Sequence, residues 1–418
     1  MAFGLNIFLN MNSNRIKLGV DVFLDERVDL VKGQRVGLIT NQTSVSASSE
    51  STAELFKKHP GIDLVSLFGP EHGVRGESQA GEYVPFYIDK KLNLPVFSLY
   101  GQSKKKEPDF LLEIDEIMRT FDTADTEKYP GKEMLQDIDV LIFDIQDVGT
   151  RIYTFLATMA FSMQSAAKRN ISFIVLDRPN PINGETMEGP LLEYPEYSSF
   201  VGLYPIPVRH GMTLGELAGL FNENYFKHKV DLSVVSMQGW TRDMWFDETH
   251  LKWINPSPNM PTLTTATVYP GQVFLEGTNV SEGRGTSNPF ELFGASWIDG
   301  YDLTTELNGL GISGVHFRNV RFTPSFSKYM GELCHGSQIH VVNREKYFPL
   351  RTSLHIIKTV MDMYPDAFEF HSDYFDKIMG TAKVREFLDS KKTIYKIIES
   401  YRNDLEKFNA KRKPYLLY

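Results

Sequence analysis

The chain has very little cysteine and no long apolar run, and both features limit what it can be. Its 418 residues include a single cysteine, Cys334, which excludes an internal disulfide framework and a metal cluster built from thiolates. No stretch approaches the roughly 18 apolar residues that a membrane-spanning helix needs. The first ten residues lack the basic start and the small-residue cleavage site of a secretory signal peptide. The chain is therefore either cytoplasmic, or its leader is truncated or atypical.

Excess basic charge and the common nucleotide and nucleophile motifs are also missing. The net charge is −9, which argues against nucleic acid and against an anionic membrane surface as partners. The chain has no GxGxxG fingerprint after a first strand, no GxxxxGK[ST] phosphate loop and no GxSxG nucleophile elbow. We therefore expect no nucleotide cofactor and no serine nucleophile of that type.

Short apolar runs alternate with segments of helical spacing in the first part of the chain. The strand-like runs lie at 35–40, 64–68, 95–99, 140–143, 173–176 and 232–235. Such alternation is typical of βαβ units and of a parallel sheet that is covered on both faces. We therefore predict an α/β fold with a doubly wound, mostly parallel sheet. Because 418 residues exceed a single small core, we also expect a second domain.

The second part of the chain has a different pattern. Three prolines within residues 255–261 forbid regular structure there, so we divide the chain into domains at 17–258 and 259–418. Beyond this boundary, residues 262–274 look extended, and a glycine-rich stretch follows. The remainder mixes strands with helices, which indicates a smaller α+β domain. In the first domain, the polar residues 102–136 are expected to form a surface excursion.

Polar side chains follow several of the predicted strands. In doubly wound sheets, ligands bind beyond the carboxyl ends of the strands. Each of these residues alone is equally typical of a turn or a helix cap. Their occurrence at four strand ends indicates a binding site at one edge of the sheet. The residues concerned are Asn41, Glu71, His72, Asp144, Asp147, Asp177 and Arg178.

Carboxylate chemistry suits this set of residues. Glycoside hydrolysis needs one acid that protonates the leaving oxygen, and usually a second carboxylate as base, nucleophile or orienting group. Glu71 follows an apolar strand that ends at Gly69-Pro70, and it is the predicted proton donor, with His72 shaping its surroundings. Asp144, Asp147 and Glu282 are the candidates for the second carboxylate. The same strand-end acids and His72 also suit a cation, but no HxxxH, HExxH or DxD spacing joins them, so we expect no metal.

Basic and aromatic residues complete the set of candidates. The basic side chains that would hold an anionic substrate are Arg75, Arg151, Arg209, His210 and Arg284. Their alternative role is structural, because an arginine near an aspartate most often forms an ion pair. The aromatic residues that would stack on a sugar, or belong to the core, are Tyr83, Tyr153, Tyr204, Trp240 and Trp245.

Six motifs occur in order along the chain, from about Lys17 to the C-terminus. They are Phe68-Gly69-Pro70-Glu71-His72-Gly73, Asp144-Ile145-Gln146-Asp147-Val148-Gly149-Thr150-Arg151, Leu176-Asp177-Arg178-Pro179-Asn180-Pro181, Pro207-Val208-Arg209-His210-Gly211-Met212-Thr213, Pro256-Ser257-Pro258-Asn259-Met260-Pro261 and Glu276-Gly277-Thr278-Asn279-Val280-Ser281-Glu282-Gly283-Arg284-Gly285-Thr286. With these motifs the chain resembles the bacterial exo-β-N-acetylmuramidase (NamZ-like) family, long catalogued as a domain of unknown function.

The resemblance implies a Rossmann-like N-terminal domain, a smaller C-terminal domain and a cleft between them. It implies release of terminal N-acetylmuramic acid from the non-reducing ends of peptidoglycan fragments, so that the partner is a muropeptide or disaccharide. The family's favoured catalytic residue corresponds to Glu71. The lactyl carboxylate of N-acetylmuramic acid would be read by Arg151, Arg209 or Arg284, because arginine binds carboxylates in a bidentate manner. Further predicted substrate contacts are Asn41, Arg75, Asp177, Arg178, His210 and Asn259.

Two other classes of function fit the same residues. One is a metal-dependent hydrolase of amide or ester bonds in cell-wall fragments, which chelation would inactivate. The other is a non-catalytic sugar-binding protein of the cell envelope, which would release no sugar. The resemblance implies a periplasmic or extracellular location, and the absence of a clear signal peptide leaves a cytoplasmic location as the alternative.

Overall fold

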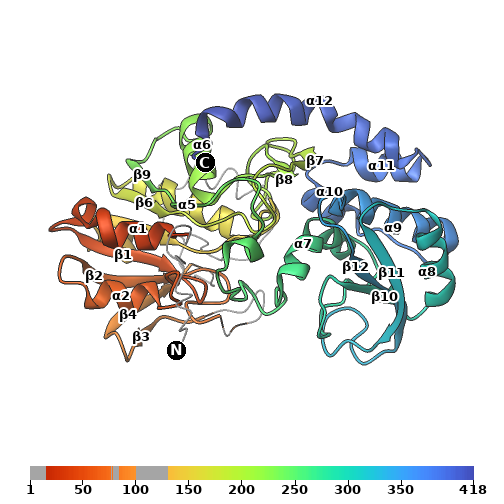
Figure 1. Cartoon of the computed structure of the whole chain (residues 1–418), viewed down its shortest axis with the longest axis horizontal. Coiled ribbons are helices and arrows are strands. Elements are labelled where there is room, and N and C mark those ends of the chain that lie inside the picture. Colours follow the sequence, from red (N-terminus) through yellow and green to blue (C-terminus); the bar gives the residue numbers. More distant parts are fainter. Residues whose placement is uncertain (1–15, 77, 79–83, 100–129) are drawn as a thin grey trace, which may run out of the picture.

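The first lobe of the protein is built on a seven-stranded sheet (Figure 1). The computed structural model describes residues 16–76, 78, 84–99 and 130–418. In spatial order, the strands are β3 (Tyr87–Asp89), β4 (Leu94–Ser98), β2 (Asp63–Gly69), β1 (Arg35–Thr40), β5 (Val140–Asp144), β6 (Ser172–Leu176) and β9 (Leu232–Val235). Neighbouring strands pair in parallel, apart from the antiparallel pair β3–β4.

The strand order makes this sheet doubly wound. The chain runs outward from β1 to β2 and β4, and then returns to place β5, β6 and β9 on the other side of β1. The direction of winding changes between β1 and β5, and in such sheets ligands bind in the crevice at the carboxyl ends of the strands flanking this point. The carboxyl ends of β1 and β5, with that of the neighbouring β2, therefore form the edge of the sheet where a ligand is expected.

Both faces of the sheet are covered by helices, as the alternation of apolar runs predicted. Within β5, Val140 and Ile142 belong to the apolar cluster that includes α1 (Gly19–Glu26) and α2 (Thr52–Lys58). The adjacent Leu141 and Phe143 point to the other face and join the cluster of α5 (Phe155–Ala167) and α6 (Leu214–Asn224). Side chains alternate between the two faces of a strand. The predicted α/β fold with a mostly parallel sheet is thus confirmed.

The second lobe is a smaller α+β unit. Its antiparallel sheet has the order β10 (Leu292–Ala295), β12 (Cys334–Val341) and β11 (Val315–Phe322). The helices of this lobe are α7 (Leu263–Gln272), α8 (Gly300–Gly309), α9 (Pro349–Met363), α10 (Ser372–Met379) and α11 (Lys383–Asp389). The predicted class of this part of the chain is confirmed. The domain boundary at 258/259, expected from the prolines, stays a prediction.

The prediction that residues 262–274 are extended is wrong, because most of this segment is helix α7. The threonines here are β-branched and resemble those of a strand. In the structure, the side chain of Thr262 caps the helix by accepting a hydrogen bond from the backbone N–H of Thr265. The helix is buried from Thr265 to Gln272 and packs against α9. Tertiary packing here outweighs the local β propensity.

The long helix α12 (Ile394–Arg412) links the two lobes. Figure 1 shows it running from α11 on the second lobe to the region of α6 on the first lobe. The chain ends at Tyr418, whose ring packs edge-on against Trp240 of the first lobe at 5.0 Å between centroids. One apolar cluster contains residues of both lobes. These contacts hold the lobes together.

The remaining elements are short. They are the hairpin of β7 (Glu188–Leu191) with β8 (Pro207–Arg209), the single-turn helix α4 (Lys132–Leu135), and the 3₁₀ turns η1 (Val28–Val31), η2 (Phe246–Thr249), η3 (Val273–Gly277) and η4 (Lys413–Tyr415). Tyr83 and residues 102–129 of the predicted surface excursion lie outside the described residues. Within the part of the chain that the structure describes, no helix is long and apolar enough to cross a membrane.

Candidate active site

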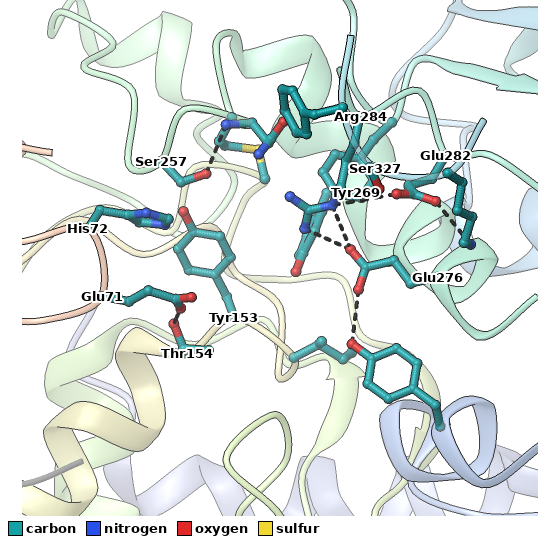
Figure 2. Close-up of a pocket in the computed structure, with 17 residues that line it drawn as sticks. Glu71, His72, Tyr153, Thr154, Ser257, Tyr269, Glu276, Glu282, Arg284 and Ser327 are labelled. Atoms are coloured by element: carbon teal, nitrogen blue, oxygen red, sulfur yellow. Dashed lines mark hydrogen bonds and ion pairs between the residues drawn. The ribbon is translucent and has the colours of Figure 1, made fainter. Parts of the chain in front are cut away.

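A cavity of about 740 Å³ lies between the two lobes (Figure 2). The first lobe contributes the loops after β2 and β5, and the proline-rich segment at the domain boundary contributes Ser257 and Asn259. The second lobe contributes α7, the glycine-rich segment, the β11–β12 loop and α10. Ligand sites commonly have volumes of about 300–1,000 Å³. The cavity therefore has the size and position expected of a small-molecule site.

A tight turn after β2 brings Glu71 and His72 to the cavity. His72 and Gly73 both have a φ of 75°, in the left-handed region, and the N–H of Gly73 donates to the carbonyl of Pro70 at 3.0 Å. At Gly69 a side chain would crowd the turn, since an added Cβ would lie 3.0 Å from the backbone nitrogen of Val74. A left-handed conformation is uncommon outside glycine, and such residues often occur at functional sites. The glycines of this motif thus permit the turn that presents Glu71.

The carboxyl group of Glu71 is held by the start of helix α5. The hydroxyl of Thr154, the residue before this helix, donates to Glu71 Oε2 at 2.8 Å (Figure 2). Glu71 is only 8% exposed. On the same wall, Nδ1 of His72 lies 2.8 Å from the carbonyl oxygen of Ser78, so Nδ1 carries the proton and donates it. The acid and its neighbour are therefore fixed in orientation.

Tyr153 lies beside Glu71 and completes this wall. Burial raises the pKa of Tyr153 well above its ordinary value, a nearby Ser257 opposes this shift, and the negative charges of Asp147 and Glu71 add to it. The phenol therefore stays protonated at neutral pH and can donate a hydrogen bond. Figure 2 shows its hydroxyl end directed between His72 and Ser257.

The opposite wall carries two acidic and two basic side chains. Glu276 Oε1 accepts hydrogen bonds from Nε and Nη2 of Arg284 at 3.0 and 2.7 Å, and its Oε2 accepts from the hydroxyl of Tyr374 at 3.0 Å. Glu282 lies 3.6 Å from Arg284 Nε and 3.2 Å from Lys328 Nζ. Burial disfavours the charge of Arg284, but Glu276 and Glu282 outweigh this effect and raise its pKa. The carboxylates on this wall are therefore paired with nearby positive charges.

Comparison with known proteins identifies the family. The sequence profile described as exo-β-N-acetylmuramidase NamZ, N-terminal, matches residues 36–126 and 119–264, and the C-terminal profile of the same family matches residues 267–418. The chain is also 48% identical over 405 residues to the peptidoglycan β-N-acetylmuramidase NamZ of Bacillus subtilis (strain 168), which covers 97% of this chain and 92% of that protein. The chain belongs to the NamZ family.

Solved structures of two related proteins share the fold. Both are DUF1343 family proteins from Bacteroides fragilis NCTC 9343. The first has a TM-score of 0.83 at 35% identity, covering 97% of this chain and 100% of its own. The second has a TM-score of 0.75 at 29% identity, covering 96% of this chain and 99% of its own. The two-lobed arrangement is thus shared with these proteins along nearly the whole chain.

The cavity brings together only some of the residues predicted from the NamZ-like motifs. Those that line it are Glu71, His72, Asn259, Glu282 and Arg284, and the aromatic candidate Tyr153. Their chemical roles stay predictions. Tyr204, Trp240 and Trp245 are buried and do not line the cavity.

Asp144 and Arg178 form a buried ion pair outside the cavity lining. Arg178 donates to both carboxylate oxygens of Asp144, at 2.5 and 2.9 Å, and the hydroxyl of Thr52 donates to the same group at 2.6 Å. Asp144 is fully buried and does not line the cavity. The structure therefore places this pair in the structural role that was the alternative for such residues. Among the residues described, no group of three or more His, Cys, Asp or Glu side chains is placed to hold a metal ion.

Two of the predicted arginines are buried and bind backbone carbonyl groups of the protein. Arg151 is buried and donates to four backbone carbonyls, two in the β7–β8 region and two at the end of α10. Arg209 is likewise buried and donates to the carbonyl of Ile182. Arg75 pairs with Asp89 at 2.6 Å. None of these three arginines lines the cavity. Of the arginines predicted to bind the lactyl carboxylate, Arg284 does line it.

Three other strand-end and motif residues also lie outside the cavity lining. The side-chain oxygen of Asn41 accepts hydrogen bonds from the N–H and the hydroxyl of Thr43, at 2.9 and 2.6 Å. Asp147 accepts from the N–H of Gly149 at 2.7 Å and lies 3.7 Å from His210 Nε2. These contacts hold the loops after β1, β5 and β8 in place.

Asp177 is buried at the start of helix α6 and contacts the end of the chain. Its carboxylate accepts hydrogen bonds from the Thr213 hydroxyl at 2.6 Å, the Gly215 N–H at 2.8 Å and the Tyr418 hydroxyl at 2.7 Å. Burial raises the pKa of Asp177 to about 6, with the Thr213 hydrogen bond opposing the shift and the charge of Glu216 adding to it. Asp177, which was predicted as a substrate contact, thus caps helix α6 in the structure and contacts the end of the chain.

We expect Asp177 to make stability depend on pH. An unfolded aspartate ionises near pH 4, so between about pH 4 and 6 the folded chain binds more protons than the unfolded chain, and its contribution to stability falls as pH rises. The expected loss is about 3 kcal/mol across this window. Asp177→Asn should abolish that part of the slope in urea unfolding measured from pH 4 to 7. The exposed Asp137→Asn should keep it, and an unchanged slope in Asp177→Asn would contradict the assignment.

Several residues that line the cavity were not predicted from the sequence, above all Glu276. Glu276 stands in the same glycine-rich motif as Glu282, and the motif itself was the signal that could have found it. Tyr374, Lys328 and Tyr269 also line the cavity. They lie on α10, the β11–β12 loop and α7, where no motif marked them.

Proposed function

We propose that this chain is an exo-acting glycosidase that releases terminal N-acetylmuramic acid from the non-reducing ends of peptidoglycan fragments. Membership of the NamZ family and the named activity of the Bacillus subtilis relative support the proposal. The structural observation that carries it is an inter-lobe cavity with an oriented, buried glutamate on one wall and carboxylates on the other. The substrate is a muropeptide or disaccharide, and a periplasmic or extracellular location would bring the enzyme to it.

Glu71 is the proposed proton donor. As the glycosidic bond breaks, its electron pair moves to the leaving oxygen, and the carboxyl group of Glu71 supplies the proton that this oxygen needs. The hydrogen bond from Thr154 orients the carboxyl group, and the closed turn around His72 keeps it facing the cavity. A water molecule then adds to the anomeric carbon, and the proton that it loses returns Glu71 to its acid form.

Arg284 is the proposed contact for the lactyl carboxylate. Nε and Nη2 of its guanidinium are engaged with Glu276. Figure 2 shows its remaining nitrogen directed toward the wall that carries Tyr153. A guanidinium can bind one carboxylate through one edge while it presents further N–H donors to another. This arrangement would favour N-acetylmuramic acid over N-acetylglucosamine, which lacks the lactyl group.

A chromogenic pair of substrates tests the function. The protein should release 4-nitrophenol from 4-nitrophenyl β-N-acetylmuramide and much less from the matching β-N-acetylglucosaminide. A protein that only binds sugars would release none from either substrate. The assay should be repeated after exhaustive chelation, because activity that is lost and then restored by a divalent metal would favour a metal-dependent hydrolase instead.

A further inference from the structure

We propose that Glu276 is the second catalytic carboxylate, acting across the cavity from Glu71. This inference rests on the glycosidase function proposed above and names a residue for the group that the reaction needs besides its acid. The candidates drawn from the sequence were Asp144, Asp147 and Glu282. The structure favours a fourth residue over all three.

The four acids differ in the exposure of their side chains and in whether they line the cavity. The side chain of Asp144 is 0% exposed and paired with Arg178, and neither Asp144 nor Asp147 lines the cavity. The side chain of Glu282 is only 2% exposed, whereas that of Glu276 is 17% exposed. A group that reacts with a bound sugar must reach it. On this criterion, Glu276 is the most accessible of the carboxylates facing Glu71.

The position of Glu276 agrees with this role. It lies in the 3₁₀ turn η3, directly after α7, at the point where the second lobe meets the cavity. Figure 2 shows Glu276 and Glu71 on opposite sides of the cavity, with Glu282 beyond Arg284. Arg284 contacts both acids, at 2.7 Å from Glu276 and 3.6 Å from Glu282. The two acids are thus on different sides of one guanidinium.

Fixed donors hold both oxygens of Glu276. Arg284 donates to Oε1, and the Tyr374 hydroxyl donates to Oε2. Burial, together with the charge of Glu276, raises the pKa of Tyr374, so its hydroxyl stays protonated and remains a donor. A carboxylate held by preorganised donors stays in place as charge develops next to it. Arg284 and Tyr374 are therefore positioning residues for Glu276.

The proposed step is the cleavage of the glycosidic bond. The bond between the anomeric carbon and the leaving oxygen breaks, its electron pair goes to that oxygen, and Glu71 provides the proton. The anomeric carbon becomes electron-poor, as in an oxocarbenium ion. The negative charge of Glu276 lies against this carbon and lowers the energy of the transition state by electrostatic attraction.

Leaving-group dependence distinguishes Glu276 from the proton donor. Glu276→Gln should lower kcat on the order of 10³-fold on both the natural disaccharide and 4-nitrophenyl β-N-acetylmuramide, because stabilisation of the sugar is needed for either leaving group. Glu276→Ala should recover part of its activity in formate or azide, small anions that can occupy the vacated space. A purely structural role would give no such rescue. Near-wild-type turnover by Glu276→Gln, or absence of anion rescue, would overturn the proposal.

Three further variants serve as controls for this experiment. Glu193→Gln alters an exposed ion pair with Lys383 away from the cavity lining and should retain full activity. If Glu276→Gln unfolds, Tyr374→Phe removes one hydrogen bond to the same carboxylate and should lower kcat with KM nearly unchanged. Glu282→Gln tests the rival acid, and loss with anion rescue there but not at Glu276 would overturn the assignment. Failure of the wild-type protein to turn over either substrate would instead refute the proposed function.

Discussion

Glu71→Gln should abolish hydrolysis of the natural disaccharide. The change preserves the size of the side chain and its acceptor for the Thr154 hydroxyl, but removes the proton that the leaving sugar oxygen needs. General acid catalysis contributes about 10²–10⁴-fold to a rate, and we expect a fall in kcat of that size. The measurement is the release of N-acetylmuramic acid from a muramyl disaccharide at saturating concentration.

An activated substrate provides the internal control for Glu71. 4-Nitrophenolate is a good leaving group that needs no proton, so Glu71→Gln should retain far more activity on 4-nitrophenyl β-N-acetylmuramide than on the disaccharide. The variant should also unfold at the wild-type temperature. Wild-type turnover of the disaccharide by Glu71→Gln would refute its role as the acid, and so would an equal loss on both substrates.

Arg151→Met should be strongly destabilising. Arg151 Nη1 donates to the carbonyls of Pro190 and Ile206 at 3.0 and 2.9 Å, and Nη2 donates to those of Ile378 and Met379 at 3.0 and 2.7 Å. The first pair belongs to the β7–β8 region and the second to the end of α10, so one side chain joins the two lobes. Methionine fills similar space but leaves these buried carbonyls without their donors. The expected loss is about 3–5 kcal/mol in the free energy of unfolding by urea.

A surface arginine gives the matched control for this prediction. Arg402 pairs with Glu399 on helix α12, and the two side chains are 55% and 45% exposed. Exposed ion pairs contribute about 0–1 kcal/mol, so Arg402→Met should change stability by no more than that. If Arg151→Met and Arg402→Met were equally stable, the contact between the lobes through Arg151 would be of no consequence for folding.

The fold of the first lobe was largely predictable because its pattern is local. Buried parallel strands are short apolar runs, and the runs at 35–40, 64–68, 140–143, 173–176 and 232–235 correspond to β1, β2, β5, β6 and β9. Helix α7 was not predictable in this way. Its threonines and valine favour a strand locally, and its burial against α9 decides the outcome.

The candidate site was predictable only in part. A cavity lies at the expected edge of the sheet, at the carboxyl ends of the strands, and Glu71 and His72 line it there. Asp144 ends β5, Arg178 follows the neighbouring β6, and the two side chains pair with each other instead. An apolar run shows where a strand ends, but it does not show which partner a charged side chain will meet. That partner often lies on an element far away in the sequence.

The sequence by itself determined the class of the fold and the family motifs, and it put Glu71 forward as the candidate acid, because each is encoded in a contiguous stretch. Only the tertiary structure separated Glu276 from Glu282, two acids of the same glycine-rich motif. Their difference in exposure depends on Arg284 between them, on Lys328 beside Glu282 and on Tyr374 beside Glu276. Lys328 and Tyr374 come from the β11–β12 loop and from α10. Their proximity to the motif is a consequence of packing within the second lobe.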